Sequence, residues 1–291
     1  MNINENHGAI AQGNVKPTLL EGITISSPPP AEEPMGFFTD STICIGCKAC
    51  EVACKQWNAL PSDGMKWSGQ SYDNTLHLSA TTWRHVSFTE QALPNGDVKW
   101  LFNSDVCKHC TAAPCQEACP TGSIIRNEWD DVYVQTDICN GCGYCVTACP
   151  FGVLQRSEAD GAVHKCTLCY DRQRGGIEPA CAKSCPTDSI RFGPVSELKD
   201  YARQRVDDLH AKGETAAYLY GADEAGEYKP LNAFFLLTEE PAATTCPKRL
   251  RTPRRACCCA TPGARRSASG LPPPAPSRSP RPGGRNNHGA T

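Results

Sequence analysis

Cysteines dominate the chemistry that this chain can perform. The sequence has 20 cysteines in 291 residues, and sixteen of them lie in four runs. In the run that begins at Cys139, three cysteines are spaced by two residues each, and a fourth, Cys149, follows after three more residues and precedes Pro150. This spacing places three thiolates on one tight loop around one corner of a cubane iron–sulfur cluster, and it directs the fourth to a neighbouring cluster. Such a run requires a partner run.

Three other runs can supply partners. Residues 44–54 have the same spacing, residues 107–119 have four residues before the third cysteine, and residues 166–185 have an eleven-residue loop there. Three of the four runs end in Cys-Pro, whereas Lys55 follows the first. Sixteen thiolates at four per cluster predict four 4Fe-4S clusters with none left over.

The fourth cysteine of each run binds the cluster of its partner run, and this exchange of ligands decides how the runs combine. The adjacent second and third runs form one unit, and the first and fourth pair around it. We therefore predict an α+β fold with two ferredoxin-like 2[4Fe-4S] modules, the inner inserted into the outer. The predicted ligand sets are Cys107, Cys110, Cys115 and Cys149; Cys119, Cys139, Cys142 and Cys145; Cys44, Cys47, Cys50 and Cys185; and Cys54, Cys166, Cys169 and Cys181.

Zinc is the main alternative for soft thiolate ligands. Zinc sites usually combine one C-x2-4-C pair with a distant second pair, and three cysteines within seven residues do not fit that arrangement. Disulfides are disfavoured because residues 1–30 lack the apolar segment of a signal peptide. His109 is interpreted as a loop residue and not as a ligand, since four cysteines already complete its run.

Five lysines lie beside predicted ligands. Positive charge near the sulfur atoms raises the reduction potential of a cluster, so these side chains could give the four clusters different reduction potentials. Solvated surface charge is an equally open interpretation for each of them. The five are Lys48, Lys55, Lys108, Lys165 and Lys183. No Ser-His-Asp arrangement, P-loop or G-x-G-x-x-G motif accompanies the cysteines, so we predict no catalytic residues.

The remaining sequence divides around these runs. Turn residues and alternation predict a hairpin from residues 85–88 and 98–103, and a second from 124–126 and 132–135. An amphipathic helix is expected over 195–212, with Ser196 as its N-cap, followed by strands at 217–220 and 232–238. The predicted segments are a flexible leader (1–35), the first half of the outer module with the hairpin insertion (36–106), the inner module (107–150), the second half of the outer module (151–193), a helix/strand clamp (194–240) and a disordered Arg/Pro-rich tail (241–291).

Charge is unevenly distributed along the chain. The net charge is −2, but ten of the 29 Lys and Arg residues and none of the 31 Asp and Glu residues follow residue 240. The acidic body argues against nucleic acid as a partner, because phosphate binding needs a basic face. No apolar stretch approaches the roughly 20 residues of a membrane span, so no transmembrane segment of its own is expected. The abrupt change near residue 241 also raises the hypothesis of a shifted reading frame in the tail.

Three sequence blocks closely resemble the iron–sulfur (beta) subunit of formate dehydrogenases. They are residues 44–58 (CIGCKACEVACKQWN), 139–145 (CNGCGYC) and 165–186, which contains KCTLCYDR and EPACAKSCP. The resemblance extends over about residues 36–240. Related subunits of dimethyl sulfoxide, polysulfide and nitrate reductases share this framework. The nitrate reductase type has Trp in place of one cysteine, whereas every ligand position here is Cys.

The resemblance implies an electron-transfer subunit without a catalytic site. Its expected partners are a molybdenum- or tungsten-pterin catalytic subunit that oxidises formate and a membrane cytochrome b or similar quinone-reducing subunit. Service to another molybdopterin oxidoreductase and a free polyferredoxin are the alternatives. The chain is expected to be soluble, either cytoplasmic or membrane-associated through a partner, and export with a signal-bearing catalytic subunit stays open.

Overall fold

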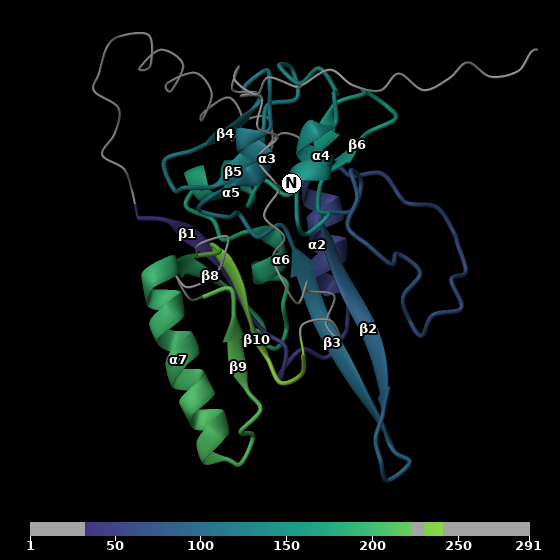
Figure 1. Cartoon of the computed structure of the whole chain (residues 1–291), viewed down its shortest axis with the longest axis vertical. Coiled ribbons are helices and arrows are strands. Elements are labelled where there is room, and N and C mark those ends of the chain that lie inside the picture. Colours follow the sequence, from purple (N-terminus) through teal and green to yellow (C-terminus); the bar gives the residue numbers. More distant parts are fainter. Residues whose placement is uncertain (1–32, 223–229, 241–291) are drawn as a thin grey trace, which may run out of the picture. The chain divides into compact units, whose positions relative to one another are not determined.

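The structure, a computed structural model, describes residues 33–222 and 230–240 (Figure 1). Almost all of the predicted leader lies outside the described residues. The predicted tail lies entirely outside them, together with the four cysteines that belong to no run. Among the described residues, no helix combines the length and the apolar character needed to cross a membrane.

A four-stranded sheet joins the two ends of the described chain. Its order is β8-β1-β10-β9, comprising Ile190–Pro194, Met35–Asp40, Ala233–Leu237 and Tyr218–Tyr220. β1 pairs antiparallel with β8 and parallel with β10. β9 and β10 confirm the two C-terminal strands that the sequence predicts, whereas β1 and β8 were not predicted.

Both faces of β1 are buried, which explains why its sequence shows no alternation. Phe37 packs in the cluster of buried residues that contains the cysteines, and the adjacent Phe38 packs in a separate cluster with α7 (Val195–Ala211). A strand buried on both faces reads as a continuous apolar run. The sheet therefore separates the cysteine-containing core from α7.

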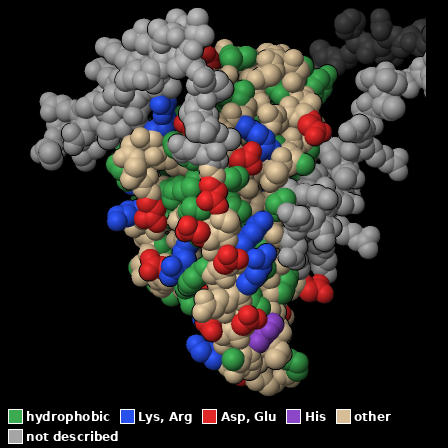
Figure 2. All heavy atoms as spheres, turned by 90° about the vertical axis from the view of Figure 1, so that its left-hand side faces the viewer, with side chains coloured by type: hydrophobic (Ala, Val, Ile, Leu, Met, Phe, Trp, Pro, Cys, Tyr) green, Lys and Arg blue, Asp and Glu red, His purple; other side chains and the backbone are tan. Residues whose placement is uncertain are grey.

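Helix α7 confirms the amphipathic helix that the sequence predicts over residues 195–212. Leu198, Ala202 and Leu209 are buried, and acidic and basic side chains intermingle on the face seen in Figure 2. The predicted N-cap is wrong: the helix begins after Pro194, and the Ser196 hydroxyl donates to the Glu33 carboxylate instead. Pro194 already has the extended backbone of an N-cap, so the N-cap lies two residues before the predicted one.

The long insertion forms the predicted hairpin, β2 (Arg84–Ala92) and β3 (Val98–Val106). Gly96 has a φ of 90° in the connecting turn, as the Asn-Gly pair predicts. The hairpin packs at its base against α2 (Ala49–Trp57), where the Glu51 carboxylate accepts a hydrogen bond from the Val86 amide. It thereby covers the loop of the first cysteine run.

Short elements form the remainder of the core. The second predicted hairpin is confirmed as β4 (Ile124–Arg126) and β5 (Val132–Val134). A two-stranded ribbon of β6 (Gln155–Arg156) and β7 (Val163–His164) follows. The short helices are α3 (Pro114–Glu117), α4 (Tyr144–Ala148), α5 (Tyr170–Arg174) and α6 (Ala180–Lys183).

Candidate metal centres

The residue before the second cysteine has a left-handed backbone in all four runs. Its φ is 66° at Gly46, 42° at His109, 68° at Gly141 and 55° at Leu168. This conformation is easy for glycine and strained for most other residues. The four loops thus share one backbone geometry, although only two of them have glycine at this position.

Short helices carry the later cysteines of each run. In α2, Cys50 and Cys54 lie one turn apart and are both buried. Residues four apart lie on the same face of a helix. α2 contacts α6, which carries Cys181, so the first and fourth runs meet there. The second and third runs meet through contacts between α3 and α4.

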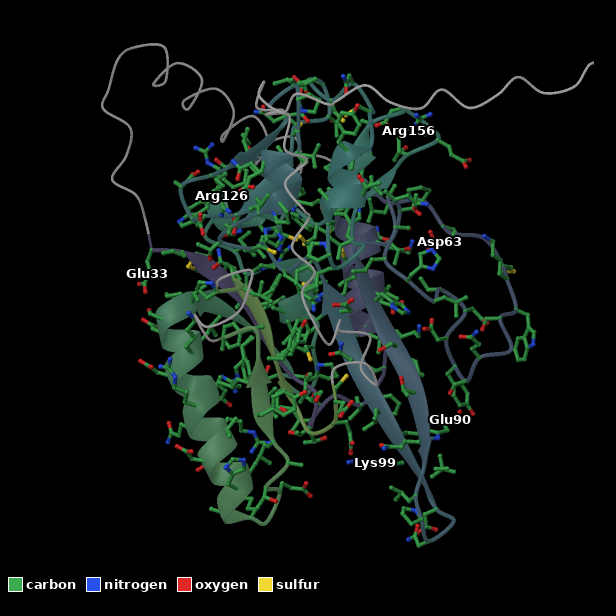
Figure 3. All side chains as sticks on the ribbon, in the orientation of Figure 1. Glu33, Asp63, Glu90, Lys99, Arg126 and Arg156 are labelled. Carbon is green, nitrogen blue, oxygen red and sulfur yellow. The ribbon has the colours of Figure 1, made fainter. Side chains whose placement is uncertain are left out.

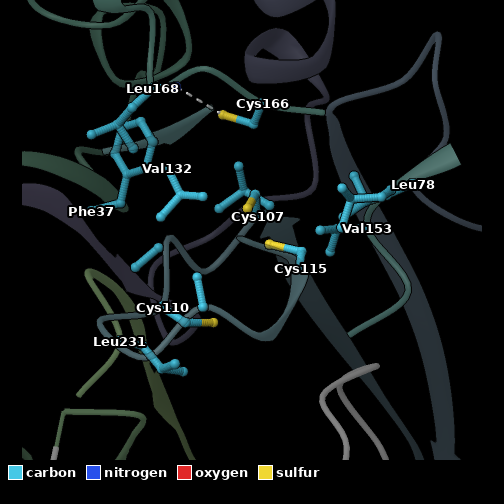
Figure 4. Packing of buried hydrophobic residues seen from close by; sticks show 14 of the residues in the cluster. Phe37, Leu78, Cys107, Cys110, Cys115, Val132, Val153, Cys166, Leu168 and Leu231 are labelled. Atoms are coloured by element: carbon cyan, nitrogen blue, oxygen red, sulfur yellow. Dashed lines mark hydrogen bonds between the residues drawn. The ribbon is translucent and has the colours of Figure 1, made fainter. Parts of the chain in front are cut away.

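Three cavities are each lined by four cysteines that form one predicted ligand set. In Figure 4, the sulfur atoms of Cys107, Cys110 and Cys115 point towards a common space. The lining sets are Cys44, Cys47, Cys50 and Cys185 (the Cys44 quartet), Cys54, Cys166, Cys169 and Cys181 (the Cys54 quartet), and Cys107, Cys110, Cys115 and Cys149 (the Cys107 quartet).

The remaining four cysteines also lie together, and we name them the Cys119 quartet. Burial, and then the neighbouring Cys119, Cys139 and Cys142, raise the pKa of the Cys145 thiol to about 11. The structure therefore brings together the same four sets that ligand exchange between runs predicts.

The quartets suit a group larger than a single metal ion. All sixteen thiols are free. Within the described residues, no three His, Cys, Asp or Glu side chains are placed to hold one metal ion.

Two buried hydrogen-bond donors line these cavities and fit an anionic, sulfur-rich group. Arg84 lines the cavity of the Cys54 quartet and His109 that of the Cys107 quartet. Among the described residues, the Nε of Arg84 and the Nε2 of His109 have no hydrogen-bond partner. Buried donors normally have an acceptor, so a group rich in sulfur acceptors at these positions would satisfy both atoms.

Several of the thiols have shifted pKa values. Burial raises the pKa of Cys50, Cys115 and Cys169 to about 12. Cys119 differs: burial raises its pKa slightly, but hydrogen bonds with Ser123 and Thr121 outweigh this effect and lower it to about 6. Ligation requires thiolates, so loading of these sites must release protons.

Several neighbouring groups can donate hydrogen bonds to the sulfur atoms. The amides of Val163 and Leu168 donate to Cys139 and Cys166 at 3.4 Å. The Ser104 hydroxyl lies 3.3 Å from the Cys50 sulfur. Such contacts orient ligands and stabilise their anionic form.

The five lysines named from the sequence occupy different environments. Lys48 and Lys55 form ion pairs with carboxylates, the latter with Asp63 at 2.9 Å on the segment labelled in Figure 3. Lys183 is exposed. Lys108 is buried, pairs with Asp105 and lowers the pKa of Cys110 against the larger effect of burial.

Lys165 has a hydrogen bond to a predicted ligand. Its ammonium group donates to the Cys107 sulfur at 3.4 Å and to the Cys166 carbonyl at 3.0 Å. Burial lowers its pKa, but the surrounding thiols of Cys107, Cys115 and Cys166 outweigh burial and raise it. Lys165 thus lies between the Cys107 and Cys54 quartets as a buried cation.

Arg84 has a corresponding position and was missed by the sequence reasoning. It is 1% exposed, and its Nη2 donates to the Cys181 sulfur at 3.3 Å. Its Nη1 lies 3.3 Å from the Ser104 hydroxyl, which contacts Cys50. Burial lowers the pKa of Arg84, but Cys181 and Cys50 outweigh burial and raise it. No local pattern could reveal this role, because Cys181 is 97 residues away in the sequence.

Comparisons with known proteins agree with this geometry. Residues 43–123 and residues 98–195 each match a family model described as a 4Fe-4S dicluster domain. The chain is 45% identical over 188 residues to the formate dehydrogenase iron-sulfur subunit of Haemophilus influenzae, covering 64% of this chain and 60% of that protein. It is 43% identical to the nitrate-inducible formate dehydrogenase iron-sulfur subunit of Escherichia coli, covering 64% and 63%.

A further relative is matched over more of its own length. The B subunit of the anaerobic dimethyl sulfoxide reductase of Escherichia coli is 36% identical over 164 residues, covering 56% of this chain and 75% of that protein. The chain spans about three-fifths of the length of the formate dehydrogenase subunits. Two dicluster domains imply four 4Fe-4S clusters. The chain belongs to the family of 4Fe-4S dicluster iron–sulfur subunits that includes these formate dehydrogenase and dimethyl sulfoxide reductase subunits.

Proposed function

We propose that this chain is the electron-transfer subunit of a formate dehydrogenase complex, with one 4Fe-4S cluster in each cysteine quartet. When bound, such clusters accept and release single electrons. The Cys107 and Cys119 quartets form the inner module, and the Cys44 and Cys54 quartets form the outer module. The convergence of each predicted ligand set in the structure supports this assignment.

The proposal of an electron relay rests on which quartets are neighbours in space. Cys181 of the Cys54 quartet raises the pKa of Cys50 in the Cys44 quartet. Cys107 raises the pKa of Cys166, and Cys145 raises that of Cys115. Contacts support the same neighbours, because Arg84 links Cys181 to Ser104 beside Cys50, and Lys165 contacts both the Cys107 sulfur and the Cys166 carbonyl. We infer the order Cys44, Cys54, Cys107 and Cys119 for the quartets.

Exposure distinguishes the two ends of this path. Cys47 in the Cys44 quartet and Cys142 in the Cys119 quartet are exposed, whereas all four members of the Cys54 quartet are buried. Apolar side chains flank both exposed positions, with Ile45 58% and Tyr144 62% exposed. We propose that electrons enter at one of these ends and leave at the other.

The partners follow from the relatives at 43–45% identity, whose names describe formate dehydrogenase subunits. A molybdenum- or tungsten-pterin catalytic subunit would contact one end, and a quinone-reducing subunit, such as a membrane cytochrome b, would contact the other. Attachment to the membrane would then depend on that partner. The similarity to the dimethyl sulfoxide reductase subunit favours another molybdopterin oxidoreductase as the second candidate.

The decisive experiment is purification of the native complex followed by reduction with formate. We expect a tightly bound pterin-containing subunit, about sixteen iron atoms per chain, and electron paramagnetic resonance (EPR) signals of reduced 4Fe-4S clusters after formate is added. Clusters that stay oxidised with formate but are reduced by another donor would contradict the assignment to formate. Purification without any large partner would favour a free polyferredoxin.

A cysteine substitution tests the ligand sets. Cys142→Ala should remove or convert one cluster, because Cys142 belongs to the Cys119 quartet, while the other three clusters remain. An iron content unchanged at about sixteen per chain, with four unaltered EPR signals, would refute that ligand set.

A further inference from the structure

His109 is the side chain whose position the proposed function does not yet explain. It is 0% exposed and lines the cavity of the Cys107 quartet. A histidine in a surface loop needs no such burial. The interior position therefore calls for a physical reason.

The backbone at His109 disfavours any side chain with a Cβ atom. Its φ of 42° is left-handed, and the equivalent position in two other runs is glycine. In those loops an added side chain would collide: a Cβ at Gly46 would lie 3.0 Å from Phe88, and one at Gly141 would lie 2.3 Å from the Gly161 carbonyl oxygen. The second run instead keeps an imidazole at a strained position, and strain of this kind is often retained at functional sites.

One ring nitrogen already has a structural partner. The amide of Val132, at the start of β5, donates to Nδ1 of His109 at 3.2 Å. Because Nδ1 accepts this hydrogen bond, a ring proton must lie on Nε2. That Nε2–H group is fully buried and has no acceptor among the described residues.

We propose that Nε2–H of His109 donates a hydrogen bond to the iron–sulfur cluster held by the Cys107 quartet and thereby raises its reduction potential. This inference rests on the proposed function, since it needs a cluster in that quartet. A hydrogen bond to sulfur stabilises the additional negative charge of the reduced state. Val132 orients the ring, and the cavity supplies the acceptor. His109 thus sets the reduction potential of this cluster without being one of its ligands.

Three substitutions separate the two ring nitrogens. His109→Asn keeps an acceptor near Nδ1 for the Val132 amide but lacks the distal donor, and asparagine tolerates a left-handed backbone. His109→Gln keeps a donor near the Nε2 position. His109→Leu loses both functions. His210→Asn is the matched control, because His210 contacts the Ala217 carbonyl beside α7 and lines none of the quartet cavities.

The readouts are an EPR-monitored redox titration and electron–nuclear double resonance of protein labelled with ¹⁵N-histidine. We expect His109→Asn and His109→Leu to lower one of four potentials by about 59 mV, a tenfold change in the ratio of oxidised to reduced cluster. His109→Gln and the control should stay near the wild type. The ¹⁵N-histidine coupling should disappear in all three His109 variants, whereas the exchangeable proton should disappear in His109→Asn and His109→Leu and persist in His109→Gln.

The outcomes distinguish the possible failures. If His109→Asn retains all four clusters with unchanged potentials, or if the ¹⁵N coupling persists in it, the hydrogen bond does not exist. A shift in His109→Leu and His109→Gln but not in His109→Asn would assign the ring to backbone support alone and overturn the inference. Should His109→Asn lose iron, His109→Gln decides: a wild-type potential together with loss of the ¹⁵N-histidine coupling supports the hydrogen bond, and persistence of that coupling overturns it. If Cys115→Ser leaves every EPR signal of the wild type unchanged, the ligand assignment fails instead.

Discussion

Replacement of Arg84 by methionine tests whether a buried cation sets the potentials of two clusters. Methionine is an unbranched side chain that suits a buried site, so the change removes the positive charge and its hydrogen-bond donors and keeps an apolar side chain there. Arg84 contacts the Cys54 quartet directly through Cys181 and reaches the Cys44 quartet through Ser104. We therefore expect both potentials to fall, and the potential of the Cys54 quartet to fall further.

The contact distances give the magnitude. Two unit charges 3.3 Å apart interact with about 5 kcal/mol at an effective dielectric constant of about 20, which is an upper limit because the added electron is spread over a cluster. Hydrogen bonds to charged groups contribute about 1.5–3 kcal/mol. At about 59 mV for each tenfold change, this corresponds to a fall of roughly 60–130 mV for the Cys54 quartet.

An EPR-monitored redox titration of the intact complex measures this effect. Arg84→Lys should retain most of the potential because it keeps the charge. Ser104→Ala should lower only the potential of the Cys44 quartet. Arg203→Met on the exposed face of α7 is the control, since Arg203 pairs with Asp200 at the surface. Four unchanged potentials in Arg84→Met, at full iron content, would refute the electrostatic argument.

Three further predictions concern packing, pH and ligand exchange. Gly36→Ala should prevent stable folding, because its Cβ would lie 1.9 Å from the Asn232 carbonyl oxygen, whereas Gly193→Ala on the paired strand has 3.9 Å of room and should unfold like the wild type on heating. Burial raises the pKa of Asp131 to about 7, above its value of about 3.9 in the unfolded chain. The contribution of this carboxyl group to the stability of the fold is therefore complete below about pH 4 and is lost as the pH rises through 7. Asp131→Asn should therefore gain thermal stability relative to wild type at pH 8 but not at pH 4, and an equal difference at both values contradicts the shift. Cys149→Ser should alter the EPR signal of the cluster that Cys115→Ser alters, although Cys149 belongs to the run of Cys139; a change in the other inner cluster would disprove the exchange.

The sequence predicts those features that depend on local patterns. Turn residues reveal the hairpins of β2 and β3 and of β4 and β5, and helical periodicity reveals α7, because each has one exposed face. β1 has no such contrast, since Phe37 and Phe38 are buried against different clusters on opposite faces of the sheet.

The same distinction applies to the candidate sites. Cysteine spacing is local and predicts the quartets, although their role as ligands remains a prediction. Arg84 and His109 act through partners that are distant in sequence or through backbone geometry, and neither leaves a pattern of residue types. Lys165 was one of five similar lysines in the sequence, and its contact with Cys107 is visible only in the structure.

The pairing of β1 with β8 and β10 constrains the order of events during synthesis. The ribosome releases Cys44 early, but its quartet also needs Cys185, and β1 gains its parallel neighbour only when Ala233–Leu237 has emerged. The cysteines of the inner module are complete by residue 149. Since domains fold as units while the chain grows, the inner sites can receive iron first, and the first run must wait in a reduced, unpaired state. The chain order thus allows maturation from the centre of the sequence outwards.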